Sequence, residues 1–167
     1  MSILKNYRRA IKAALVAANV LPAEQIIIDR QADEWEVIGQ AIQMAENGLC
    51  LHIAEASGTN TEPDSDEILA VVNIVLTIFC EPVYHPTADD GYDSTPAAPV
   101  ADTWPEEELW EAMVRTLHGK FIEAEGSTLL NHCRYCLRML SWSHVPNEFD
   151  YYARATTFKF TLYLPTT

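Results

Sequence analysis

The chain has few basic side chains. It contains 11 lysine and arginine residues against 24 aspartate and glutamate residues, which gives a formal net charge of -13 at pH 7. Proteins that hold nucleic acid by its backbone neutralise the phosphates with clustered lysine and arginine. The composition therefore excludes a generic DNA-binding role, although an acidic surface suits a channel through which a polyanion passes without adhering.

The chain also lacks a hydrophobic run long enough for a membrane span. A helix that crosses a bilayer needs ~20 consecutive apolar residues, and the apolar stretch Ile68–Cys80 is interrupted by Asn73 and Thr77. Residues 1–20 carry basic residues ahead of an alanine-rich stretch, a layout that secretory signals share. Because the basic residues are interleaved with apolar ones at helical spacing, we interpret this segment as an amphipathic helix.

The chain has four cysteines, and their spacing provides one weak metal motif. A structural zinc site needs four ligands, commonly from two closely spaced pairs, whereas this chain has the single pair Cys133 and Cys136 beside His132. One alternative function is therefore a small zinc-binding module or metal-dependent enzyme in which Cys50 or Cys80 completes the site. We favour the interpretation that all four are packed or partly exposed thiols in a reducing cytosol.

Motifs for catalysis are missing. There is no phosphate-binding loop, no dinucleotide-binding glycine pattern, no GxSxG and no HExxH. Glu106, Glu107 and Glu108 are expected to be solvated side chains in the first turn of a helix, where acids are favourable. The acidic stretches 64–67 and 89–93 lack the ligand spacing of a calcium loop. We therefore predict a protein that is not an enzyme and has no catalytic, cofactor-binding or metal site.

Apolar periodicity predicts a single α+β domain over residues 1–167. The expected sheet is mostly antiparallel, with a long central hairpin, and two or three helices pack on one face. Helices are expected at residues 2–19, 34–46 and 104–117. Strands are expected at residues 26–29, 48–55, 68–80, 137–145 and 151–164. Long polar loops are expected at residues 57–67 and 82–105.

The central hairpin, residues 48–82, carries the functional prediction. Successive residues of a strand point to opposite faces, so one face of the strand Ile68–Cys80 is wholly apolar and the other is mixed. A mixed face is expected to be partly exposed or joined to another subunit, and we predict that it forms a subunit interface through Val71, Asn73, Val75 and Thr77. The polar turn is predicted to line a channel or to contact a neighbouring ring through Thr59, Asn60, Glu62, Asp64, Asp66 and Glu67.

The order of these elements resembles a known family. The segments that carry the resemblance are residues 48–53, the strand Ile68–Cys80 followed by Glu81 and Pro82, the helix ending at Leu117 with His118 and Gly119 after it, and the final strand Tyr152–Leu164. Together they resemble the tail-terminator and tail-completion proteins of long-tailed bacteriophages. The chain departs from that pattern in the helix at 34–46 and the long segment 82–105.

The resemblance implies an α+β subunit of a homo-oligomeric ring, typically a hexamer, at the head-proximal end of the tail tube. Such a ring stops tube polymerisation and joins the tail to the head connector, so the implied partners are the tail tube protein and the head–tail connector protein. DNA would pass through the lumen without specific binding, and no cofactor or membrane is implied. The implied location is the tail or neck of the virion, after assembly in the host cytoplasm. A head–tail connector or stopper is the nearest alternative role.

Overall fold

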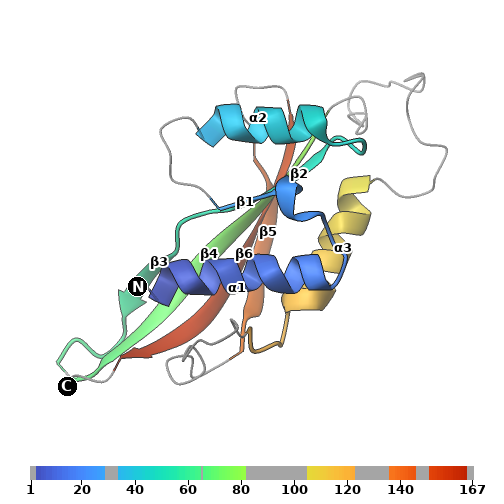
Figure 1. The fold of residues 1–167 in the computed structure, drawn as a ribbon. Helices are drawn as coiled ribbons and strands as arrows, with labels where there is room; N and C mark the ends of the chain where they lie inside the picture. The colour runs from blue at the N-terminus through green and yellow to red at the C-terminus, as the bar shows by residue number, and fades with distance from the viewer. Residues whose placement is uncertain are drawn as a thin grey trace.

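The fold is organised around one mostly antiparallel sheet, as Figure 1 shows. The computed structural model describes residues 3–28, 34–64, 66–81, 105–122, 136–145 and 151–164, and these residues form three α-helices and a six-stranded sheet. In chain order the elements are α1 (Ile3–Ala17), the short 3-10 helix η1 (Ala23–Gln25), β1 (Ile26–Ile27), α2 (Glu34–Met44), β2 (Leu49–Ile53), β3 (Ser57–Asn60), β4 (Ile68–Cys80), α3 (Pro105–Leu117), β5 (Arg138–His144) and β6 (Tyr152–Leu164). The α+β class predicted from the sequence is confirmed.

Strand β4 pairs along both of its edges. On one edge it is antiparallel to β6 over its whole length, from Ile68 opposite Leu164 to Cys80 opposite Tyr152. On the other edge β2 pairs with the end of β4 and β3 pairs with its beginning. The strand order is β1-β2-β4-β6-β5, with β1 parallel to β2 and every other pairing antiparallel.

The main core lies between the sheet and the helices α1 and α3. Val72, Ile74, Leu76 and Ile78 of β4 are buried against it, as the alternation of the strand predicts. The two helices contribute apolar stripes at helical spacing, which are Tyr7, Ile11 and Leu15 from α1 and Leu109, Met113 and Leu117 from α3. The amphipathic helix expected near the N-terminus is thus confirmed.

Helices α1 and α3 share the face of the main core, as predicted for two or three helices, whereas α2 packs on the opposite face. Ile38 and Ile42 of α2 form a second buried cluster with Phe79, Cys50 and Ala153. These three strand residues point away from the main core, since their neighbours along each strand point into it. They make an apolar patch at one end of the sheet, and burying that patch requires a helix on that side.

The predicted loop at 57–67 contains a strand. Ser57, Gly58, Thr59 and Asn60 form β3 and pair with residues 70–73 of β4, so Thr59 and Asn60 are strand residues and not part of the turn. The physical reason lies in β4, which extends beyond β2 and leaves backbone groups that need hydrogen-bond partners. The other predicted loop falls outside the described residues up to residue 104, while Pro105 begins α3.

The end of α3 depends on a glycine in the left-handed conformation. Gly119 has φ +76, and a Cβ there would meet no atom within 4 Å, so only the backbone opposes a side chain. We expect Gly119→Ala to lower the free energy of unfolding by about 1 kcal/mol.

Gly39 within α2 is the matched control. Its alanine variant should raise stability by about 0.5 to 1 kcal/mol, because the nearest atom to the new Cβ, Tyr151 Oη, is 3.7 Å away. Urea unfolding followed by circular dichroism measures both, and equal signs would contradict the helix end described above.

Candidate functional site

The predicted subunit interface lies on a sheet face that we call the open face. Val71, Asn73, Val75 and Thr77 are half-buried and lie on the side of β4 opposite α1 and α3. The open face is defined here as these four residues, the residues opposite them on β6 (Thr161, Lys159, Thr157 and Ala155), and Arg138, Ser141 and Ser143, which pair with β6 from β5. Among the described helices, α2 packs on this side, through Phe79 at one end of the sheet.

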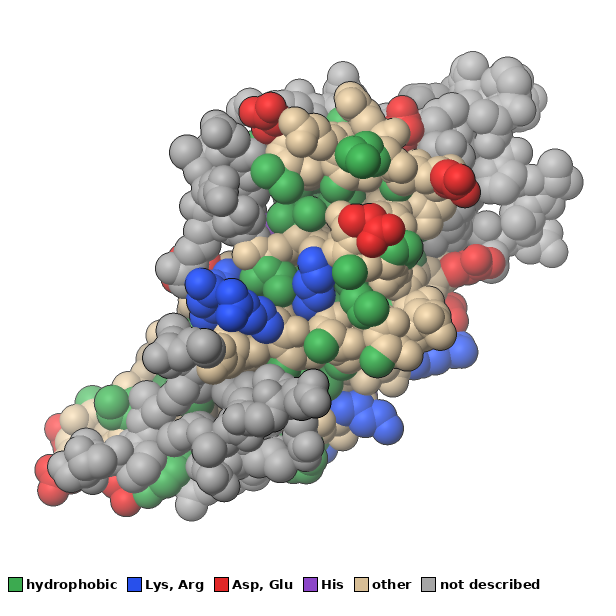
Figure 2. Space-filling model, viewed as in Figure 1, with side chains coloured by type: hydrophobic (Ala, Val, Ile, Leu, Met, Phe, Trp, Pro, Cys, Tyr) green, Lys and Arg blue, Asp and Glu red, His purple; other side chains and the backbone are tan. Residues whose placement is uncertain are grey.

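The acidic turn lies at the far end of the β3–β4 hairpin. Glu62, Asp64, Asp66 and Glu67 are exposed, as are Thr59 and Asn60, and Figure 2 shows acidic side chains gathered at the end of the molecule where the hairpin turns. We call these four acids the acidic tip. Two sets of hydrogen bonds fix the strand end from which the tip projects. The backbone N–H and the hydroxyl of Thr61 both donate to the Leu69 carbonyl at 2.8 Å, and Asn60 Oδ1 accepts from the Glu62 N–H at 3.2 Å.

A small depression occurs on the open face where β5 begins. Its volume is about 280 Å³, and it is lined by Val71, Cys136, Arg138, Lys159, Phe160 and Thr161. It exists because β5 starts at Arg138 while β4 and β6 continue past that point. Arg138 and Lys159 stand directly opposite each other on β5 and β6, and both are exposed. We call this pair and the hollow beside it the basic depression.

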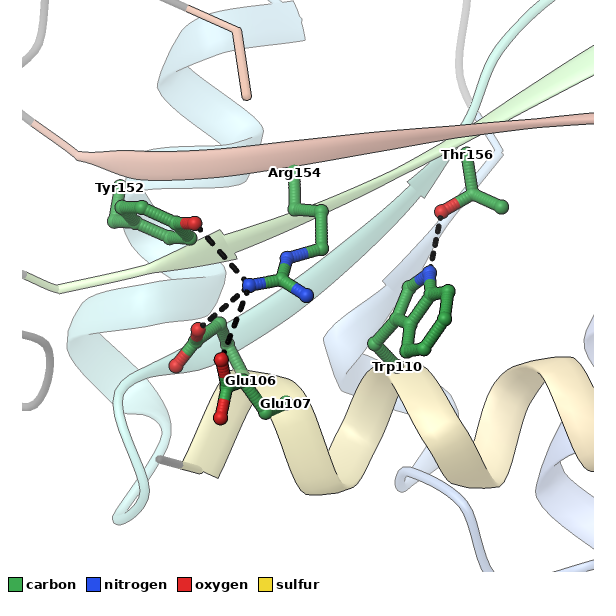
Figure 3. A network of polar contacts seen from close by, with 6 residues as sticks. All are labelled: Glu106, Glu107, Trp110, Tyr152, Arg154 and Thr156. Atoms are coloured by element: carbon green, nitrogen blue, oxygen red, sulfur yellow. Dashed lines mark hydrogen bonds and ion pairs between the residues drawn. The ribbon is translucent and has the colours of Figure 1, made fainter. Parts of the chain in front are cut away.

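The glutamates that begin α3 do not form a solvated cluster, which corrects the prediction for Glu106. Glu106 has no exposed surface and accepts a hydrogen bond from the Arg154 guanidinium at 3.3 Å. Glu107 is half-buried and lies 3.6 Å from the same guanidinium. Figure 3 shows the Arg154 side chain directed from β6 toward the first turn of α3. The ion pair joins the first turn of α3 to β6, so Glu106 anchors the helix on the sheet.

Aromatic and hydroxyl groups extend this anchor along α3. The Trp110 indole N–H donates to Thr156 Oγ1 at 3.1 Å, and its ring packs against Trp142 with centroids 5.2 Å apart. At the other end of the helix, the Met139 N–H donates to His118 Nδ1 at 3.0 Å. Helix α3 is therefore tied to β6 by its first turns and to β5 by its end.

One feature of the sequence, an arginine on the apolar side of a strand, indicated the Glu106–Arg154 pair. On β6 the residues that face the main core are Phe158, Phe160 and Leu162, and Arg154 lies on the same side by alternation. An arginine on an apolar face needs a charged partner, since burying an isolated charge is costly. An acidic partner for Arg154 was therefore to be expected, but the sequence did not indicate which acidic residue it would be.

The proposed completion of a zinc site by Cys50 or Cys80 is wrong. Cys136 lies beside Val71, whereas Cys80 is nine residues further along β4, a separation of about 30 Å at the rise of an extended strand. Zinc–sulfur bonds are ~2.3 Å long. No group of three or more potential metal ligands occurs within the described residues, and His132 and Cys133 lie outside them.

The thiols of Cys50 and Cys80, at the α2 end of the sheet, have low reactivity. Burial raises the pKa of Cys50 to about 12, and burial together with the nearby Glu106 and Glu81 raises the pKa of Cys80 to about 12. The thiolate is the form that binds metals and reacts as a nucleophile. These two cysteines therefore act as small buried hydrophobic residues.

Removing the arginine from the α3 anchor tests its energetic importance. We expect Arg154→Met to lower the free energy of unfolding by about 3 to 5 kcal/mol, because it leaves the buried Glu106 carboxylate without its cation. The matched control is Arg115→Met, since Arg115 pairs with Glu111 at 2.8 Å on the exposed side of α3. Its loss should cost about 0.5 kcal/mol or less. Urea unfolding measures both, and similar losses in the two variants would show that the buried pair is not an anchor.

Alkylation tests the assignment of the cysteines. In the folded protein at pH 8.5, iodoacetamide should modify Cys136 while leaving Cys50 and Cys80 unmodified, because both are buried and the raised pKa keeps each thiol protonated at that pH. Peptide mapping by mass spectrometry identifies the modified positions, and the urea-unfolded protein provides the fully reactive control. Rapid modification of Cys50 or Cys80 in the folded state would overturn the assignment.

Similarity to known proteins does not supply a function. No protein-family model and no curated protein sequence matches the chain. In the described part of the chain, no helix is both long and apolar enough to span a bilayer. A functional proposal therefore has to be argued from the open face, the acidic tip and the basic depression.

Proposed function

We propose that this chain is a structural subunit of a phage virion, a tail terminator that forms a ring at the head-proximal end of the tail tube. In this role it stops tube polymerisation and joins the tail to the head connector. The proposal assigns it no catalytic residue. Its partners are further copies of itself, the tail tube protein and the head–tail connector protein.

The observation that carries the proposal is the open face. A half-buried row of valine, threonine and asparagine side chains runs along β4, and their cross-strand neighbours on β6 and β5 extend this surface. Sheets with both faces covered have apolar strands throughout, whereas this row is mixed. A mixed row of this kind suits contact with another subunit, which buries the valines while the polar side chains keep the free subunit soluble.

The placement of charge supports the same proposal. The acidic tip projects at the end of a hairpin, away from the main core, and the net charge of the chain is -13. A subunit with this net negative charge lets DNA move through the lumen of a ring without binding. A projecting hairpin also provides a patch different from the open face, and contacts between two different patches generate closed rings when the rotation between subunits closes.

Size-exclusion chromatography with light scattering, together with negative-stain electron microscopy, tests the proposal. We expect six-subunit rings, and we expect those rings at one end of tail tubes when purified tubes are added. Rings that bind the head connector and ignore tubes would point to the connector or stopper role instead. A persistent monomer that never caps tubes would overturn the proposal.

A charge placed on the open face should prevent assembly. We expect Val75→Asp to reduce the ring fraction at least tenfold, since about 1.4 kcal/mol corresponds to a tenfold change and an unpaired buried carboxylate costs more than that. Ala13→Asp is the control, because Ala13 is exposed on α1 on the other side of the sheet. Light scattering gives the ring fraction and circular dichroism checks folding. Equal assembly of the two variants would place the interface elsewhere.

A further inference from the structure

Two like charges face each other at the basic depression. Arg138 and Lys159 are directly opposite on neighbouring antiparallel strands, an arrangement that destabilises a sheet. Within the described part of the chain, no ion pair and no side-chain hydrogen bond reaches either residue. An anionic group placed between them would relieve the repulsion, so the depression is suited to carboxylates.

The shape of the depression restricts what can enter it. Its lining includes the apolar residues Val71 and Phe160 together with the two cations, and its volume is about 280 Å³. A helix is ~10 Å across with its side chains, which is too wide for this hollow. The side chains of a turn fit, because a turn presents a few short side chains on a narrow end.

The acidic tip is such a turn, but it lies too far from the basic depression of the same copy to enter it. The acidic tip ends at Glu67, and Asn73 of β4 lies in register with Lys159. The six residue steps from Glu67 to Asn73 span about 20 Å in an extended strand. Because β3 and β4 remain paired up to Asn60 and Ala70, the tip extends along the strand direction, away from the depression of the same copy. The tip of a second copy has no such restriction.

We propose that the acidic tip of one copy docks in the basic depression of the next copy, and that this charge-paired contact joins neighbouring subunits. The inference rests on the proposed ring and deepens it by naming the two patches that meet. The donor patch is the tip with Glu62 and Asp64, and the acceptor patch is Arg138 with Lys159. Each copy uses both patches, so the contact repeats around a ring.

A second basic surface provides the competing acceptor and the control. Lys5 and Arg9 are exposed on α1, and Figure 2 shows basic side chains over that helix. Lys12 is engaged elsewhere, because its Nζ donates to the Ile26 carbonyl at 2.6 Å. Lys5 and Arg9 stand on a helix on the other side of the sheet, whereas Arg138 and Lys159 line a hollow on the open face. The basic depression is concave, so we choose it over the α1 surface as the acceptor for the acidic tip.

Paired charge reversals test the contact. The acceptor variant is Arg138→Glu with Lys159→Glu, and the donor variant is Glu62→Lys with Asp64→Lys. Substitutions are used in place of a deletion because Thr59 and Asn60 belong to β3 and removing them would cut a strand. We expect each variant alone to lose at least nine-tenths of the ring fraction. In the acceptor variant two glutamates face the acidic tip, and in the donor variant two lysines of the tip face Arg138 and Lys159.

An equimolar mixture of the two variants should recover rings. The acidic tip of the acceptor variant meets an intact basic depression, and the reversed tip of the donor variant meets a reversed depression. A single chain carrying all four substitutions should assemble as well. Light scattering measures the ring fraction. Melting of each variant followed by circular dichroism confirms folding, and the single variant Arg138→Glu should melt no lower than the native protein, because it turns a repulsive pair into an attractive one.

The outcomes separate this inference from the proposed function. If the native protein forms rings and the acceptor variant forms them equally well, the contact is wrong and the ring stands. If Lys5→Glu with Arg9→Glu abolishes rings instead, the tip docks on α1 and the inference fails. Loss in both variants without recovery in the mixture also overturns it. A native protein that stays monomeric, with and without tail tubes, removes the ring and the inference together.

Discussion

The full-length pairing of β4 with β6 is the constraint on which the structure depends. Thirteen residues of β4 are in register with β6 without a break, and every other strand except β1 attaches to one of these two. The same ladder fixes which side chains enter the core, because a slip of one residue would turn the apolar side of one strand to the opposite face of the sheet. The open face follows from this register, whereas the acidic tip depends also on the pairing of β3 with β4, and the basic depression on the pairing of β5 with β6.

The elements that a local pattern defines were predictable from the sequence. Apolar residues at helical spacing placed α1 and α3 to within two residues of their observed ends, and the alternation in Phe158, Phe160 and Leu162 identified the buried side of β6. The buried side of β4 followed from the same rule. These features depend only on the periodicity of a helix or a strand, which the chain displays directly.

The features that were missed depend on contacts between distant segments. The polar sequence of β3 has no strand signal of its own, and it pairs because β4 is longer than β2. The side on which α2 packs is set by Cys50, Phe79 and Ala153, which come from three separate strands. The partner of Glu106 is 48 residues away on β6. In each case the deciding residue was visible in the sequence, but its neighbour in space was not.

The two-ended attachment of α3 has a mechanical consequence. Its first turn is held to β6 by Arg154, and its end is held to β5 by hydrogen bonds from Gly119 to the Leu137 carbonyl and from Met139 to His118. A helix that is attached at both ends to the two strands of a hairpin restricts bending of that hairpin. We therefore expect the edge strand β5 to bend less than an edge strand held by its backbone hydrogen bonds alone.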